Sequence, residues 1–135
     1  MTDNETLITY RLSQAHEALA AAKATIDGAI SFRAAVNRSY YAMFYSLNAL
    51  MIKADLQFQT SKHTGIIAAF DKEFVKTKKF EPKYSEMLHA QFQMRQQGDY
   101  KELVEISEQQ ANVALEQATQ FVQAVEEYVS KLEQH

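Results

Sequence analysis

Residues 33–45 read RAAVNRSYYAMFY, and this stretch decides how the chain folds. It has the apolar content of a buried helix, yet it carries two arginines and an asparagine among four aromatic side chains. Burying a charged or amide side chain costs several kcal/mol unless that group is paired. Either these polar groups pair inside the protein, or they line a cleft or an interface.

Outward from this stretch, little interrupts helix formation, since the 135 residues include only three glycines and one proline. The sequence therefore predicts a nearly all-helical protein. We expect five helices, which begin near residues 4, 31, 62, 82 and 107. Long amphipathic helices joined by short loops form up-and-down bundles, so the predicted fold is an all-α bundle in which residues 1–135 make one domain.

The first and last helices have the clearest patterns. The first is expected to begin after Asp3 or Asn4 as its N-cap and to end at Gly28. The last begins with Ser107 and Gln110, which resemble a capping box. In both helices apolar residues recur at intervals of four and three, which is typical of a face turned toward a core.

The helices between them complete the bundle. After a loop at 55–60, Ser61 is expected to cap a third helix whose apolar face extends to Val75. Pro82 fits the first turn of a fourth helix, which Gly98 is expected to end. The predicted core is apolar and aromatic and is contributed by all five helices: Leu12, Leu19, Tyr40, Met43, Leu47, Phe70, Leu88, Phe121 and Val125.

The composition excludes several classes of protein. Without cysteine, the chain has neither a disulfide framework nor a cysteine-ligated metal. No apolar run reaches the ~18–20 residues that span a membrane, and the polar, acidic N-terminus does not resemble a secretory signal. We therefore expect a cytoplasmic protein with no membrane segment and no cofactor.

Charge is unevenly distributed along the chain. Residues 62–83 hold six lysines against three acidic residues, a balance of +3, whereas residues 99–135 hold eight acidic residues against two lysines. These runs are either solvated helix faces with a lysine-rich turn, or a local basic patch for phosphates or an acidic partner.

Histidines offer little support for a metal site. Glu86 and His89 are spaced as Glu-x-x-His, but di-iron bundles carry this motif twice and here it occurs once. No metal site is therefore predicted. His63 follows Lys62 at the start of a predicted helix. This is either an exposed pair of residues or an anion-binding helix N-terminus.

Arg95 lies just before Gly98, where the fourth helix is expected to break. Asp99 could pair with Arg95 or cap the next segment, which would make the group structural. Alternatively, Arg95 binds a phosphate in a cleft beside Tyr100, because the planar guanidinium donates paired hydrogen bonds to phosphate oxygens.

Three segments together resemble a bacterial and archaeal branch of the HEPN superfamily. They read NRSYYAMF at 37–44, SKHTGI at 61–66 and FVKT at 74–77, and Arg95 followed by Asp99 and Tyr100 fits the same branch. The resemblance covers about residues 10–125. The order and spacing of these segments are specific for the family and much less so for an activity.

The resemblance implies a small helical bundle that dimerises. Many HEPN domains are ribonucleases of toxin–antitoxin, phage-defence or RNA-processing systems, and many are encoded beside a minimal nucleotidyltransferase that acts as antitoxin. Their metal-independent active site is built from an arginine followed, after four to six residues, by a histidine. Here Arg95 fits the arginine, but the residue five places on is Tyr100. With an ordinary pKa of ~10, tyrosine is a poor base near neutral pH.

The resemblance, read with the polar residues of the second helix, gives three functional hypotheses. The first is an RNA-binding, nucleotide-binding or partner-binding module of a toxin–antitoxin-like or defence system, with weak or absent nuclease activity. The second is an active metal-independent endoribonuclease toxin, and the third a dimeric scaffold without a ligand. Expected partners are a second copy of the chain, a nucleotidyltransferase antitoxin, and RNA or a nucleotide.

Candidate site residues follow from the same reasoning. Arg95 and Tyr100 are the candidate catalytic residues. We expect Arg38 and Arg95 to lie close together in a polar cleft. The candidate binding residues are polar or aromatic and come from the second, third and fourth helices: Asn37, Arg38, Tyr41, Lys62, His63 and Asp99.

Overall fold

The computed structural model describes residues 2–56, 62–100 and 105–133, with the backbone alone at 97–100 and 133. This part of the chain contains five α-helices and no strand, which confirms the all-α prediction. A π-helical turn, η1, directly follows the third helix. In chain order the elements are α1 (Asp3–Asp27), α2 (Phe32–Lys53), α3 (His63–Phe70), η1 (Asp71–Val75), α4 (Pro82–Tyr100) and α5 (Glu108–Glu133).

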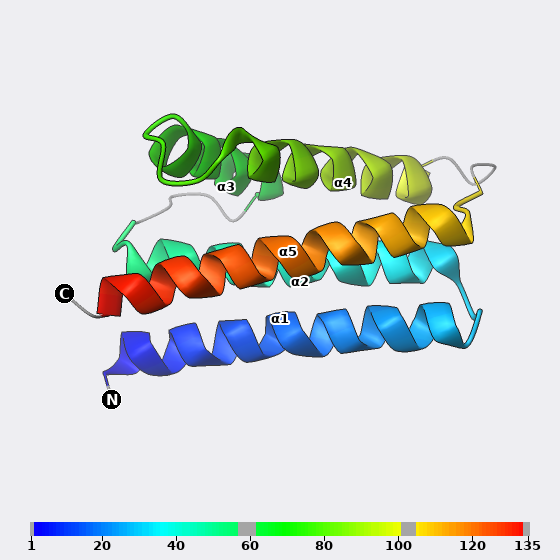
Figure 1. Ribbon diagram of the computed structural model, residues 1–135, viewed down its shortest axis with the longest axis horizontal. Coiled ribbons are helices and arrows are strands. Elements are labelled where there is room, and N and C mark those ends of the chain that lie inside the picture. Colours follow the sequence, from blue (N-terminus) through cyan, green and yellow to red (C-terminus); the bar gives the residue numbers. More distant parts are fainter. Residues whose placement is uncertain (1, 57–61, 101–104, 134–135) are drawn as a thin grey trace.

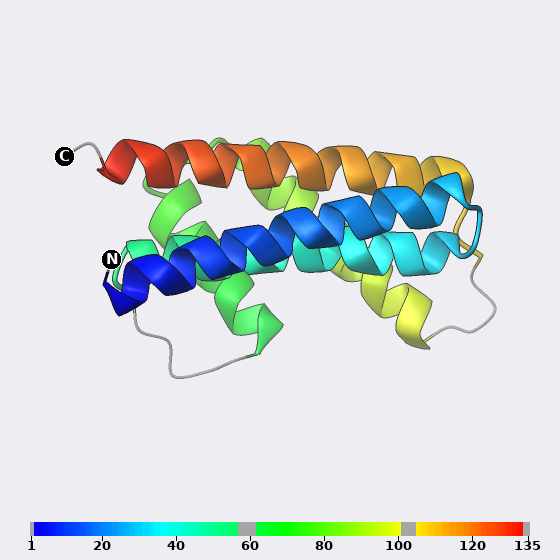
Figure 2. The same cartoon turned by 90° about the horizontal axis from the view of Figure 1, so that it is seen from below.

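The four long helices run alternately up and down the bundle (Figure 1). Helix α2 is the central element and contacts α1, α3, α4 and α5. Helices α1, α2 and α5 lie lengthwise beside one another, whereas α4 crosses them at an angle (Figure 2). The short α3 lies on the same side of α2 as α4 (Figure 1). None of the helices in the described ranges combines the length and hydropathy that crossing a bilayer requires.

Side-chain caps fix where the helices begin. The capping box predicted for α5 is confirmed, since Gln110 N donates to Ser107 Oγ over 3.1 Å and Ser107 N donates to Gln110 Oε1 over 2.8 Å. The N-cap predicted for α1 is wrong by one or two residues. Thr2 occupies that position and forms a capping box with Glu5, because a threonine with glutamate three residues on satisfies two N–H groups at once.

The predicted core is largely confirmed. Seven of its nine residues are buried, and Leu12 and Leu19 are half-buried against the same cluster. Phe70 lies at the centre of an aromatic group, with ring centroids 5.3 Å from Phe80 and 5.4 Å from Phe121. Because α3, α5 and the turn before α4 all contribute rings, this aromatic group holds the short α3 against the long helices.

Two predicted boundaries differ from the structure. The third helix does not continue as one α-helix to Val75, because η1 widens its last turn. Helix α4 does not end at Gly98 but continues to Tyr100, since a glycine costs a helix interior only about 1 kcal/mol. The predicted cap Ser61 lies outside the described residues, and Lys62 occupies the N-cap position of α3.

Candidate functional site

Arg95, near the C-terminal end of α4, reaches across to α2. Its Nε donates to Oδ1 of Asn37 over 3.0 Å, and one terminal nitrogen donates to the Tyr41 hydroxyl over 3.2 Å. Asn37 and Tyr41 are four residues apart on a helix and so share one face. The polar residues of the opening stretch of α2 therefore pair with an arginine that lies 54 to 58 residues further along the chain.

Two aromatic rings also hold the guanidinium. Its carbon lies 5.4 Å from the ring centroid of Tyr40 and 5.2 Å from that of Tyr41. Tyr40 is fully buried, and Tyr41 is half-buried. Cation–π contacts of this kind stabilise a cation by about 0.5–2 kcal/mol, more where water is excluded. The charge of Arg95 is thus fixed in place by α2 rather than free to sample many rotamers.

His63, the first residue of α3, completes the cluster. Its Nδ1 lies 2.7 Å from the hydroxyl of Tyr40. The imidazole stacks on Phe44, with centroids 3.9 Å apart and planes 23° from parallel. It also meets the ring of Tyr41 edge-on at 6.0 Å. Arg95 and His63 therefore contact the same two tyrosines. We call these four residues, together with Asn37, the Arg95 cluster: Asn37, Tyr40, Tyr41, His63 and Arg95.

Burial controls protonation in the Arg95 cluster. Burial raises the pKa of Tyr40 far above its ordinary value, outweighing the opposite effect of Arg95, so its hydroxyl keeps the proton. That hydroxyl has no other hydrogen-bond partner among the described residues, and a buried donor requires an acceptor. Tyr40 therefore donates to Nδ1 of His63, which leaves the ring hydrogen of the neutral imidazole on Nε2.

Burial also lowers the pKa of His63 from its ordinary value, and the positive charge of Arg95 lowers it further. The imidazole is therefore neutral at neutral pH. In the tautomer set by Tyr40, its Nε2 is a hydrogen-bond donor and not a base. The Arg95 cluster thus combines a fixed cation with a neutral donor, a pairing suited to binding an anion.

Acidification is expected to destabilise the fold through His63. Because the pKa of His63 is lowered in the folded protein, the unfolded chain binds this proton more readily. The stabilising contribution is therefore complete above about pH 6.5 and is lost as the pH falls through the folded pKa. Thermal unfolding midpoints of the wild type and His63→Gln, measured between about pH 5 and pH 8, should converge toward low pH. A constant difference between the two proteins would contradict this assignment.

Only some of the predicted site residues lie at the Arg95 cluster. Asn37, Tyr41 and His63 join Arg95, whereas Arg38 is exposed and makes no polar contact with Arg95 among the described residues. Lys62 is exposed at the N-cap of α3. The roles of these two residues in binding stay predictions. The side chains of Asp99 and Tyr100 lie outside the described residues, although both belong to α4 by backbone.

Sequence reasoning missed part of the site. Tyr40 is predicted above only as a core residue, and Phe44 is not among the predicted site residues. Both face His63 as well. The signal was present in the spacing, because residues 37, 40, 41 and 44 follow the repeat of one helix face. In the described part of the chain, no group of three histidine, aspartate or glutamate side chains is placed to hold a metal ion.

Comparisons with known proteins agree with these findings. The sequence profile of the family described as "HEPN domain" matches residues 8–128. A "UPF0332 protein" of Thermotoga maritima is 38% identical over 132 residues, which cover 98% of this chain and 98% of that protein. Two proteins of Methanocaldococcus jannaschii are also similar. The one named "Putative toxin MJ0142" is 32% identical over 70% of this chain and 63% of its own length. The one named "Putative toxin MJ0605" is 30% identical over 87% of this chain and 85% of its own length.

Proposed function

Because the chain belongs to the HEPN domain family, we propose that it is an RNA-binding or nucleotide-binding module of a toxin–antitoxin-like or defence system. The names of two archaeal relatives support the biological setting. The observation that carries the binding proposal is the Arg95 cluster, in which a guanidinium is oriented by Asn37 and Tyr41 beside the imidazole of His63.

The ligand chemistry follows from the donors in this cluster. Arginine carries a permanent charge and presents its N–H groups in a plane that matches phosphate oxygens. A neutral His63 with hydrogen on Nε2 adds a second donor of different geometry. Single-stranded RNA suits such a site, because proteins bind it through phosphate contacts combined with aromatic side chains.

The direct test is a binding titration with a cleavage assay in the same tube. Purified protein is titrated into fluorescein-labelled single-stranded RNA in the presence of a chelator, and the RNA is then run on a denaturing gel. Saturable binding with intact RNA supports the binding module. Absence of binding to RNA and to free nucleotides would leave a scaffold without a ligand and would overturn the proposal.

A second candidate is a metal-independent endoribonuclease, and the contact of both His63 and Arg95 with Tyr40 favours it. In this mechanism Arg95 stabilises negative charge that develops on the phosphate, and a histidine replaces the one missing after Arg95. The hydrogen bond from Tyr40 occupies the lone pair on Nδ1, so cleavage should be weak. Cleavage that persists with chelator and falls about 10²–10³-fold in Arg95→Ala would promote this candidate. The Tyr100→Phe variant, in the same assay, tests whether the hydroxyl of Tyr100 contributes to cleavage.

A homodimer is the expected assembly of this module. The face of α2 made of Asn37, Tyr41, Tyr45 and Asn48 is only half-buried, and tyrosine is enriched at protein interfaces. Light scattering at micromolar concentration should give twice the 15.4 kDa of one chain. A monomeric mass at every concentration would count against it. The proposed antitoxin partner is a nucleotidyltransferase.

A further inference from the structure

A cavity of about 200 Å³ lies between α3 and α4. Its walls are mostly apolar, with two ionisable side chains, and they are formed by Thr64, Ile67, Ala68, Asp71, His89 and Phe92. Pockets that enclose drug-sized ligands are larger, at ~300–1,000 Å³. The volume of this cavity therefore suits a single ring system better than a whole nucleotide.

The cavity adjoins the Arg95 cluster. Thr64 directly follows His63 in α3. Phe92 lies three residues before Arg95 on α4, so the two side chains are neighbours on one face of that helix. The ring of Phe92 also lies 5.9 Å from that of Tyr40. An RNA phosphate held at Arg95 would therefore place its attached nucleoside at the mouth of this cavity.

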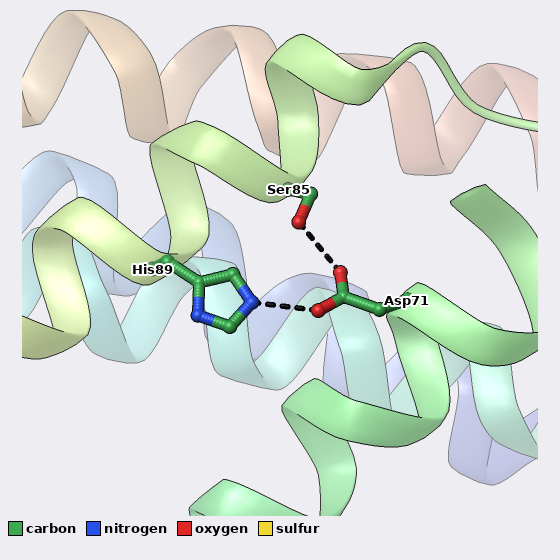
Figure 3. Close-up of polar contacts among 3 residues, drawn as sticks. All are labelled: Asp71, Ser85 and His89. Atoms are coloured by element: carbon green, nitrogen blue, oxygen red, sulfur yellow. Dashed lines mark hydrogen bonds and ion pairs between the residues drawn. The ribbon is translucent and has the colours of Figure 1, made fainter. Parts of the chain in front are cut away.

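Two residues of the cavity wall, Asp71 and His89, belong to a hydrogen-bonded group that Ser85 completes from outside the wall (Figure 3). Ser85 Oγ donates to one carboxylate oxygen of Asp71 over 2.6 Å, and Nε2 of His89 lies 2.6 Å from the other. Asp71 is the first residue of η1, so the widened turn is the element that presents this carboxylate to α4. Both oxygens of Asp71 are thus engaged by α4.

The contact with Asp71 fixes which ring nitrogen of His89 faces the carboxylate. A carboxylate only accepts, so Nε2 of His89 carries a hydrogen, and in the neutral imidazole Nδ1 holds a lone pair. Figure 3 shows Nδ1 on the side of the ring away from Asp71. In its neutral form, His89 therefore adds one hydrogen-bond acceptor to a wall that also carries the ring of Phe92.

We propose that this cavity is the subsite for a nucleobase of single-stranded RNA, adjacent to the phosphate bound at Arg95. The base packs against Phe92, and its ring N–H or exocyclic amino group donates to Nδ1 of His89. The inference rests on the proposed function, because it places a base beside the phosphate site. Unstacked bases bound by aromatic side chains and by hydrogen bonds at their edges are the usual way in which proteins read single-stranded RNA.

The test compares a short single-stranded RNA with an abasic ribose-phosphate chain of the same length, each labelled with fluorescein. The wild type should bind the base-bearing chain about tenfold more tightly, as expected for one stacked base. Ala68→Leu fills the cavity from an exposed position and should abolish this preference. The matched control is Ala90→Leu, which changes an exposed alanine of α4 outside the cavity and should keep it.

The outcomes separate this inference from the proposed function. If the wild type binds both chains equally, or if Ala68→Leu keeps the preference, the nucleobase subsite is overturned while phosphate binding stands. If neither chain binds, both proposals fail. A third outcome is that Ala68→Leu changes the molecular mass of the protein in solution but keeps the preference for the base-bearing chain. The cavity would then receive a second copy of the protein, and the nucleobase subsite would likewise be overturned. Arg95→Ala should weaken binding of both chains alike.

Discussion

Replacing Arg95 with alanine is expected to weaken binding of single-stranded RNA about 10- to 100-fold. Hydrogen bonds to charged groups contribute about 1.5–3 kcal/mol, and each 1.4 kcal/mol changes an equilibrium constant tenfold. The loss should be accompanied by a weaker salt dependence, with the slope of log K against log salt reduced by about 0.7 for one phosphate contact. Fluorescence anisotropy at several salt concentrations measures both quantities.

Two further variants give this experiment its controls. Arg95→Lys keeps the charge and loses the planar donor geometry, so it should recover only part of the affinity. Arg11→Ala also removes one positive charge, but from α1. There Arg11 donates a hydrogen bond to Gln14 and does not belong to the Arg95 cluster. An equal loss of affinity in Arg11→Ala would mean that RNA responds to overall charge and would contradict a specific site at Arg95.

Replacing Phe70 with alanine is expected to lower the free energy of unfolding by about 3–5 kcal/mol, the usual cost of truncating a buried phenylalanine. Phe70 is fully buried, and its ring contacts those of Phe74, Phe80 and Phe121. The truncation leaves a cavity among these rings, which are contributed by η1, the turn before α4 and α5. For a chain of this size the midpoint of thermal unfolding should fall by about 10–20 °C.

A surface substitution is the control for this stability prediction. Ile30 is 79% exposed, so Ile30→Ala removes a similar apolar side chain without creating a cavity. Its free energy of unfolding should stay within about 0.5 kcal/mol of the wild type. A Phe70→Ala protein that unfolds at the same temperature as Ile30→Ala would show that the aromatic group does not anchor α3.

The fold was predictable because local patterns determine most of it. Apolar residues at intervals of three and four identified α1 and α5 and the faces that they bury, and the capping box at Ser107 marked a helix start. Those signals depend on neighbours within one or two turns. The boundary errors arose where the local signal is weak, as at Gly98, which α4 passes through because a glycine costs a helix interior only about 1 kcal/mol.

The site was only partly predictable, for a different reason. The unusual mixture of charge and aromatic residues at 33–45 pointed to a paired polar cluster, and Arg95 was identified as a candidate. The pairing itself depends on contacts between residues 23 to 58 positions apart. No local pattern indicates that His63 meets Tyr40, because that contact depends on how α3 packs across α2.

The hydrogen bond between Tyr40 and His63 also has an evolutionary consequence. A sequence that loses the imidazole while keeping the tyrosine leaves a fully buried hydroxyl without its acceptor, a penalty of about 1–3 kcal/mol. A prior change of Tyr40 to phenylalanine removes that penalty. Positions 40 and 63 are therefore epistatic, and descendants of this sequence should reach a new residue at 63 more readily by first changing 40.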